Sequence, residues 1–273
     1  MVLTLPYPLR YRCAYDAELT SAVLRAFLRA LFAELRRRAR KQCEVRAEQC
    51  GAVTFVQRFG SALNLNLHFH TLALDGAYTY SAAHRNPPRF LPLPPPSGAE
   101  VARVLAGTAR RIQQLLEQRA EGDEDALARD QPLLALLAAA SLRTRIATGP
   151  HTGDRWRRLG DRVAPEPADG DPDSSTRVPQ HGGMSLHADV AVPARDRRRL
   201  ERLCRYVARP PIANDRLEER ADGRLTLRLK TRWRDGTTHI LMERSELIER
   251  LVPLIPPPRA HQVRYHGVFA PHA

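Results

Sequence analysis

A strand-turn-strand pattern early in the chain restricts the fold more than any other feature. Residues 51–58 and 63–75 are rich in β-branched, apolar and aromatic side chains, and Phe59-Gly60-Ser61 between them has the composition of a turn. Because so short a connection makes two strands antiparallel neighbours, these residues predict a hairpin. Helical patterns occur on both sides of it, so we expect an α+β fold with an antiparallel sheet flanked by helices rather than a doubly wound sheet.

Periodicity and breaker residues locate the other elements. An apolar stripe predicts a helix over 17–40, and residues 2–12 before it have the pattern of an extended segment. Six prolines in 87–96 predict a loop or an extended ribbon. We further expect helices over 100–117, 125–146, 195–208 and 245–252, a strand over 184–192, and a hairpin of 224–233 with 237–242.

The chain is expected to have three parts. Residues 153–183 consist mainly of Asp, Pro, Gly, Ser and Arg without apolar periodicity, and such a composition buries too little surface to offset the entropy of ordering. We therefore predict an N-terminal part over 1–150, a flexible linker over 151–183, and a C-terminal part over 184–273 that includes a small hairpin and helix extension.

Composition narrows the class of protein. With 273 residues, of which 43% are hydrophobic, the chain has enough apolar material for a core. It has no apolar run long enough to cross a membrane, and its start, MVLTLPYPLR, is unlike a signal peptide, so we expect a cytoplasmic protein. The net charge of +13 predicts a polyanionic partner, and all but two of the 43 basic residues are arginine, whose planar fork binds phosphate bidentately.

Two histidines in the second predicted strand have the spacing of metal ligands. The period of two places Asn64, Asn66, His68 and His70 on one face of this strand, with apolar residues on the other. A pair of adjacent imidazoles suits a divalent metal but requires a third ligand from a neighbouring strand. Two candidates for it are Gln57, at the end of the adjacent strand, and His187, which shares a polar face with Asp189.

A tyrosine near the end of the helix predicted over 195–208 is a candidate nucleophile. Tyr206 falls at the edge of an apolar stripe formed by Leu200, Leu203, Cys204 and Val207. A tyrosine at such an edge exposes its hydroxyl while packing holds its ring, although the same position suits a tyrosine that only covers a core. Arg205 and Arg209 lie beside it in the sequence and are candidates for holding a phosphate.

Four stretches carry a resemblance to a known family. They are LTLPYPLRYR; GAVTFVQRFGSALNLNLHFHTLALDG; MSLHADVAV followed by LCRYVARPPIANDRL; and LKTRWRDGTTHILMERSELIERLVPLIPPPRAHQVRYHGVFAPH. These stretches span nearly the whole chain apart from residues 85–130 and 150–182. They resemble the HUH endonucleases, and among these the rolling-circle transposases of insertion sequences.

The resemblance implies a reaction and the residues for it. It implies that His68 and His70 hold a divalent metal such as Mg²⁺ or Mn²⁺, and that Tyr206 attacks a phosphodiester and becomes linked to the 5′ end of the cut strand. The expected activity is nicking and rejoining of single-stranded DNA in transposition, with single-stranded or hairpin element ends as the partner. The expected DNA contacts are Arg205, Arg209, Asn66, Arg58 and Lys230.

Two departures from the family pattern bear on the expected activity. Some relatives carry a second tyrosine four residues away, but Arg202 and Pro210 occupy those positions here, so a single-tyrosine mechanism is expected. Relatives also tend to carry a zinc-binding module before the nuclease, and its lack here suggests a truncated, non-catalytic DNA-binding remnant. A plasmid replication initiator or relaxase would also fit these residues. A small-molecule hydrolase built on an eight-fold barrel shares the His-x-His pattern, but residues 153–183 interrupt the strand-helix alternation that such a barrel requires.

Overall fold

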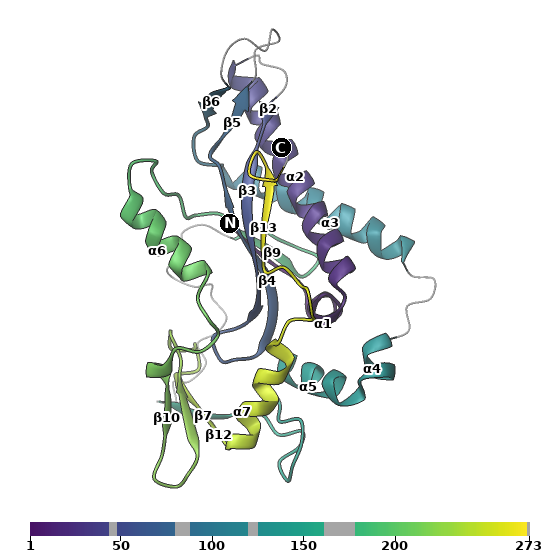
Figure 1. Cartoon of the computed structure of the whole chain (residues 1–273), viewed down its shortest axis with the longest axis vertical. Coiled ribbons are helices and arrows are strands. Elements are labelled where there is room, and N and C mark those ends of the chain that lie inside the picture. The colour runs from purple at the N-terminus through teal and green to yellow at the C-terminus, as the bar shows by residue number, and fades with distance from the viewer. Residues whose placement is uncertain (44–47, 80–87, 120–124, 161–177, 272–273) are drawn as a thin grey trace.

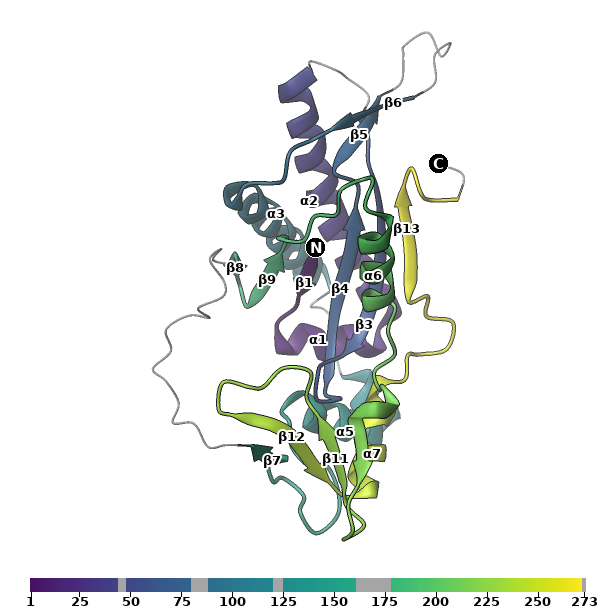
Figure 2. The ribbon, with the colours of Figure 1, turned by 90° about the vertical axis from the view of Figure 1, so that its left-hand side faces the viewer.

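A six-stranded antiparallel sheet runs through the middle of the molecule (Figures 1 and 2). The computed structural model describes residues 1–43, 48–79, 88–119, 125–160 and 178–271. The strand order in the sheet is β13 (Val263–Gly267), β3 (Gly51–Phe59), β4 (Leu65–Ala73), β1 (Val2–Thr4), β9 (Met184–His187) and β8 (Gln180–His181). The N-terminal strand β1 therefore pairs with two strands that are far apart in the sequence, β4 and β9.

Helices cover the two faces of this sheet unequally. On one face lie α2 (Ala17–Cys43) and α3 (Gly98–Gln118), and α6 (Arg197–Val207) lies on the opposite face (Figure 1). The main core forms on the α2 and α3 side, where Leu67, Phe69 and Leu186 from the sheet are almost fully buried together with Phe27 of α2. Burial of these apolar side chains is the main driving force for folding of this part of the chain.

Two smaller sheets extend the structure at its ends (Figure 1). One has the order β10 (Leu217–Glu219), β11 (Leu225–Arg228), β12 (Thr237–Met242) and β7 (Arg157–Gly160), and the other has the order β2 (Glu48–Gln49), β5 (Gly76–Thr79) and β6 (Arg89–Pro92). The remaining helices are α1 (Tyr7–Tyr15), α4 (Ala126–Asp130), α5 (Pro132–Leu142) and α7 (Arg244–Leu251), with 3₁₀ turns at Asn214–Arg216 and Val252–Leu254. None of the helices in the described part of the chain is both long and apolar enough to cross a bilayer.

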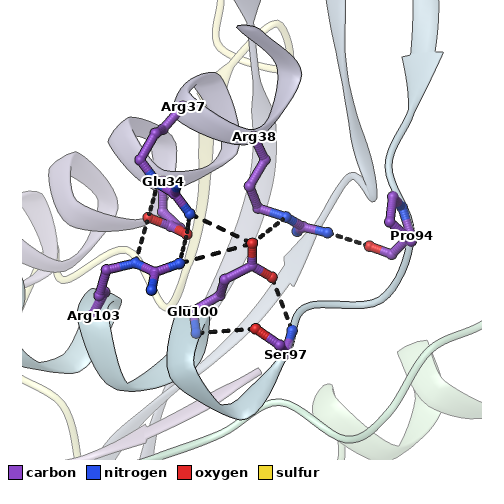
Figure 3. Close-up of polar contacts among 7 residues, drawn as sticks. All are labelled: Glu34, Arg37, Arg38, Pro94, Ser97, Glu100 and Arg103. Carbon is purple, nitrogen blue, oxygen red and sulfur yellow. Dashed lines mark hydrogen bonds and ion pairs between the residues drawn. The ribbon is translucent and has the colours of Figure 1, made fainter. Parts of the chain in front are cut away.

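A network of arginines and glutamates joins α2 to α3 (Figure 3). Glu34 of α2 accepts hydrogen bonds from Arg37 at 2.6 Å and from Arg103 of α3 at 3.0 Å. Glu100 lies 3.3 Å from Arg38 and also forms a capping box with Ser97 at the start of α3. The same carboxylate thus caps one helix and pairs with a cation of the other, which fixes how α3 begins against α2.

The α+β fold with antiparallel sheets flanked by helices is confirmed, and so are the central hairpin and the helix predicted over 17–40. The eight-fold barrel is excluded, because each described sheet is open and antiparallel. The extended segment over 2–12 is wrong beyond Thr4, since α1 starts at Tyr7 with a proline in its first turn, where proline is tolerated. The strand predicted over 184–192 ends at His187.

The predicted linker over 151–183 needs correction at both ends. Strand β7 forms within it because Arg157–Gly160 pairs with β12, and Trp156 just before it is buried. Strand β8 likewise pairs with β9. Residues 161–177, the middle of the predicted linker, lie outside the described residues.

The Glu34 network makes a prediction about stability and pH. Hydrogen bonding to Arg37 is the main cause that lowers the pKa of Glu34 from 4.5 to about 2 in the folded chain. A carboxylate whose pKa is lower in the folded chain than in the unfolded chain stabilises the fold at pH values above its unfolded pKa. For Glu34 this stabilisation is lost as the pH falls from about 4.5 toward 2. We expect Glu34→Gln to lower the free energy of unfolding at pH 7 by about 1 kcal/mol, since the partners are partly solvated.

Urea denaturation of both proteins between pH 7 and pH 3 measures this difference, which should shrink as the pH falls. Glu18→Gln is the control, because the Glu18 side chain is 90% exposed. A Glu34→Gln difference that is constant over the whole pH range contradicts the assignment.

Candidate functional site

The site is formed on the face of β4 that points away from the main core. Leu65, Leu67 and Phe69 are buried against the helices on one side of the strand, so alternation places Asn66, His68 and His70 on the α6 side. His68 and His70 are only 9% and 7% exposed, and their Nε2 atoms lie 3.0 Å apart. The two imidazoles predicted to lie side by side are therefore in direct contact.

The backbone determines which nitrogen of His68 faces its partner. His68 Nδ1 lies 2.6 Å from the carbonyl oxygen of Asn66. A carbonyl can only accept, so Nδ1 carries the proton and Nε2 keeps its lone pair. The Nε2 atom of His68 thus points toward His70, and its lone pair can accept a hydrogen bond or bind a metal.

Burial favours the neutral form of both imidazoles. Burial is the largest cause that lowers the pKa of His68, and Arg209 and Arg10 contribute as well. Burial, followed by the proximity of His68, lowers the pKa of His70 to about 3. A neutral imidazole offers a lone pair, which metal coordination requires.

Gln57 is brought to the same place by strand pairing. It is the cross-strand partner of His68 in the β3–β4 hairpin, so the two side chains lie on the same face. Its Nε2 donates a 2.7 Å hydrogen bond to the carbonyl oxygen of Val207, which ties the sheet to the end of α6. Its Oε1 is buried and has no hydrogen-bond partner.

His187 lies on the same face but is displaced to one side. Val2 pairs with His70 on one side and with His187 on the other, so one strand separates the two histidines and their backbones are about 10 Å apart. His187 is about half exposed and lies 3.2 Å from Asp189. Within the described residues, no group of three or more His, Cys, Asp or Glu is placed to hold a metal. Gln57 lies directly across from His68, whereas one strand separates His187 from His70.

Helix α6 brings Tyr206 to the histidines. The Tyr206 ring packs edge-on against His70, with 6.1 Å between the ring centroids. The helix begins at Asp196, whose side chain caps the backbone amide of Arg199. The predicted buried stripe is wrong in most of its length, because only Val207 of α6 is buried and Leu200 is exposed, whereas Tyr206 itself is 49% exposed.

Cations surround the tyrosine. Arg209 lies 4.3 Å and Lys230 5.2 Å from the centroid of the Tyr206 ring. Two polar atoms nearby, Arg209 Nη1 and Asn66 Oδ1, are buried and have no hydrogen-bond partner. Neither Arg209 nor Lys230 pairs with an acidic side chain among the described residues.

A third cation, Arg216, was not predicted. It is 8% exposed and donates hydrogen bonds to the carbonyl oxygens of Arg228 and Ser61, both at 2.7 Å. Burial is the main cause that lowers the pKa of Lys230, and Arg209 and Arg216 lower it further, so the three cations lie close together. Arg216 ends a short 3₁₀ turn, and nothing in the local sequence distinguishes it from the many other arginines.

Two of the predicted DNA contacts lie elsewhere. Arg58 follows Gln57, so alternation turns it to the opposite face, where it is 5% exposed and donates to the carbonyl oxygens of Leu254 and Pro253. This guanidinium joins chain segments inside the protein, which corrects the expectation that it contacts DNA. Arg205 lies on the exposed side of α6 and pairs with Glu201 at 2.8 Å.

Comparisons with known proteins identify the family. The family model described as "Putative transposase" matches residues 51–273, which include both histidines, Gln57 and Tyr206. A search of curated proteins and a search of solved structures each found no significant match. Since the family model covers most of the chain and all of the candidate site, the chain belongs to this transposase family.

Proposed function

We propose that the chain nicks and rejoins single-stranded DNA by the HUH mechanism during rolling-circle transposition, with Tyr206 as the nucleophile. The observation that carries the proposal is the packing of Tyr206 from α6 against His70 from β4, two residues far apart in the sequence. Membership of a transposase family supports DNA as the substrate. The net charge of +13 supports a polyanionic partner independently of the family.

The residues present fit a divalent metal. Two nitrogen ligands with bonds of roughly 2.1 Å at a right angle are about 3.0 Å apart, and His68 Nε2 and His70 Nε2 are 3.0 Å apart. The buried Oε1 of Gln57, which has no hydrogen-bond partner, is suited to be the third protein ligand. A metal bound by His68, His70 and Gln57 would polarise the scissile phosphate and stabilise its developing charge.

Tyr206 supplies the nucleophile for cleavage of the phosphodiester. Its Oη loses its proton and forms a new bond to phosphorus while the bond from phosphorus to the 3′ oxygen breaks, and the displaced 3′ oxygen takes up a proton, so that no net proton is gained or lost. The products are a 5′-phosphotyrosine and a free 3′-hydroxyl, so the energy of the phosphodiester is retained for rejoining. Another 3′-hydroxyl then attacks the same phosphorus and releases the tyrosine.

Arg209 and Lys230 are proposed to hold the phosphate beside this nucleophile. Both lie on the Tyr206 ring, and neither is neutralised by a carboxylate within the described residues. The partnerless Nη1 of Arg209 is a buried donor, and leaving such a donor unsatisfied is costly. A phosphate oxygen would satisfy it with a charge-assisted hydrogen bond.

Two competing functions share parts of this geometry. A plasmid replication initiator or relaxase would use the same chemistry, and the transposase family match favours transposition. A non-catalytic DNA-binding remnant would keep the arginines without needing Tyr206. Covalent capture of DNA separates this remnant from an active enzyme.

We expect Tyr206→Phe to abolish a covalent DNA adduct while leaving DNA binding nearly unchanged, because the ring remains and only the nucleophilic oxygen is lost. The measurement is denaturing electrophoresis after incubation with labelled single-stranded oligonucleotides from the element ends, with Mn²⁺ or with EDTA. Tyr265→Phe is the control, since Tyr265 lies exposed on β13. An adduct that persists in Tyr206→Phe excludes this nucleophile.

The third ligand can be identified by metal binding without DNA. We expect Gln57→Ala to weaken Mn²⁺ binding, measured by electron paramagnetic resonance titration, by roughly 10- to 100-fold. His187→Ala should change it less than about twofold, because one strand separates His187 from His70. Gln57→Glu keeps an oxygen ligand and should retain binding, which distinguishes ligand loss from loss of the hydrogen bond to Val207. If His187→Ala has the larger effect, the assignment of Gln57 is incorrect.

Two arginines of the same helix region provide a matched pair. Arg209→Gln should slow adduct formation by about tenfold or more, since it removes the cation beside Tyr206 that is proposed to bind the phosphate. Arg205→Gln should change the rate less than about twofold, because an exposed pair such as Arg205 with Glu201 contributes little. Equal effects in single-turnover assays would show that Arg209 acts only through general charge.

A further inference from the structure

A large cavity lies outside the histidine and tyrosine site. It has a volume of about 1250 Å³, is open to solvent, and is lined by α1, α4, the end of α5 and the segment 143–158. These elements lie together below the α2 and α3 layer, on the side of the sheet opposite to α6 (Figure 1). A cavity of this size has room for more than one nucleotide, because small-molecule sites commonly occupy about 300–1000 Å³.

One wall of the cavity is aromatic. Tyr7, Tyr11 and Tyr15 line it from successive turns of α1. Tyr7 is 60% exposed, and the guanidinium of Arg10 lies 4.8 Å from its ring centroid. Tyr11 is held by a 2.9 Å hydrogen bond to Asp125 and by edge-on packing against Tyr15.

The other wall is cationic. Arg143 and Arg155 line the cavity, and neither pairs with an acidic side chain in the described part of the chain. Of the acidic residues of the cavity, Asp16 pairs with Arg119 and Asp130 with Arg129, both at 2.9 Å, whereas Asp125 only accepts a 2.9 Å hydrogen bond from the neutral Tyr11 and keeps its charge. Arg143 and Arg155 together exceed the single charge of Asp125, so the balance of these groups is positive.

The cavity is connected to the nicking site through the start of the chain. Thr4 pairs with His68 across β1 and β4, and α1 begins three residues later at Tyr7. Arg10 of this helix stacks on Tyr7, with its guanidinium 4.8 Å from the ring centroid. A strand that follows this segment of the chain from the histidines would thus reach the Tyr7 side of the cavity.

We infer that this cavity is a second DNA subsite, which holds a single-stranded segment flanking the nick. Nucleobases would stack on the tyrosine wall, with Tyr7 as the exposed platform, and Arg143 and Arg155 would bind phosphates. Alternating aromatic and cationic contacts are how proteins bind single strands without reading their sequence. Duplex DNA presents no free base faces to such a wall. The inference rests on the proposed function only in naming the strand as the one that is nicked.

Charge reversal tests the cationic wall. We expect Arg143→Glu/Arg155→Glu to weaken binding of a labelled single strand of roughly 30 nucleotides by about tenfold or more, measured by fluorescence anisotropy. The slope of log K against log salt should also fall by about 1.4 for two lost phosphate contacts. Arg29→Glu/Arg110→Glu is the matched control, with the same charge change on exposed positions of α2 and α3. Equal losses in the two double variants overturn the inference.

Substitution of Tyr7 tests the aromatic wall. Tyr7→Ala should weaken single-strand binding by roughly tenfold, whereas Tyr7→Phe, which keeps the ring, should bind like the wild type. Tyr7 is 60% exposed, so both proteins should fold, and this test remains valid if the charge-reversed double variant does not. An equal loss of duplex affinity in Tyr7→Ala would overturn the single-strand assignment.

The two proposals fail in different ways. Tyr206→Phe removes the covalent adduct but should leave binding at the cavity intact, and Arg143→Glu/Arg155→Glu should still form an adduct at saturating DNA concentration, because Tyr206 and the histidines are unchanged. If no adduct forms with any protein but the cavity variants still lose affinity, the nuclease proposal fails and the subsite remains. If adducts form and the cavity variants bind like their controls, only the subsite fails.

Discussion

The alternation of side chains along β4 is the constraint on which the rest of the structure depends. Leu65, Leu67 and Phe69 are buried on the side of α2 and α3, and this burial keeps His68 and His70 on the other side. A shift of one residue in the pairing with β3 would exchange the two sets, placing the imidazoles in the apolar core and the leucines toward Tyr206. The energy that holds the histidines in position therefore comes from the apolar residues between them.

The cations on the two faces of the central sheet differ in whether they pair with carboxylates. On the helical face, Arg37, Arg38 and Arg103 are paired with Glu34 and Glu100, which offset most of their charge and join α2 to α3 (Figure 3). On the α6 face, Arg209 and Lys230 surround a tyrosine ring without a carboxylate partner among the described residues. Cations collected near each other and partly desolvated repel one another, so this arrangement favours an anionic ligand.

The helix that carries Tyr206 is attached to the sheet by few contacts. Val207 is its one buried residue, and the hydrogen bond from Gln57 to the Val207 carbonyl anchors its end. Because Gln57 also pairs across the strands with His68, the residue that positions the tyrosine helix adjoins the histidine pair. Any change that draws Gln57 toward a metal would act directly on the position of Tyr206.

The sequence by itself determined the α+β class, the β3–β4 hairpin, the long helix α2 and the common face of His68 and His70, because these follow from local periodicity and a short turn. It indicated Tyr206, and it gave Gln57 as the third metal ligand with His187 as the competing candidate. Only the tertiary structure showed that Tyr206 packs against His70 and that Arg58 lies in the protein interior. It also showed that one strand separates His187 from His70 and that Arg216 lies close to Arg209 and Lys230. It also placed β13 beside β3 and β7 beside β12. Each of these depends on which distant segments pair or pack together, and such long-range contacts leave no periodic trace in the segments that make them.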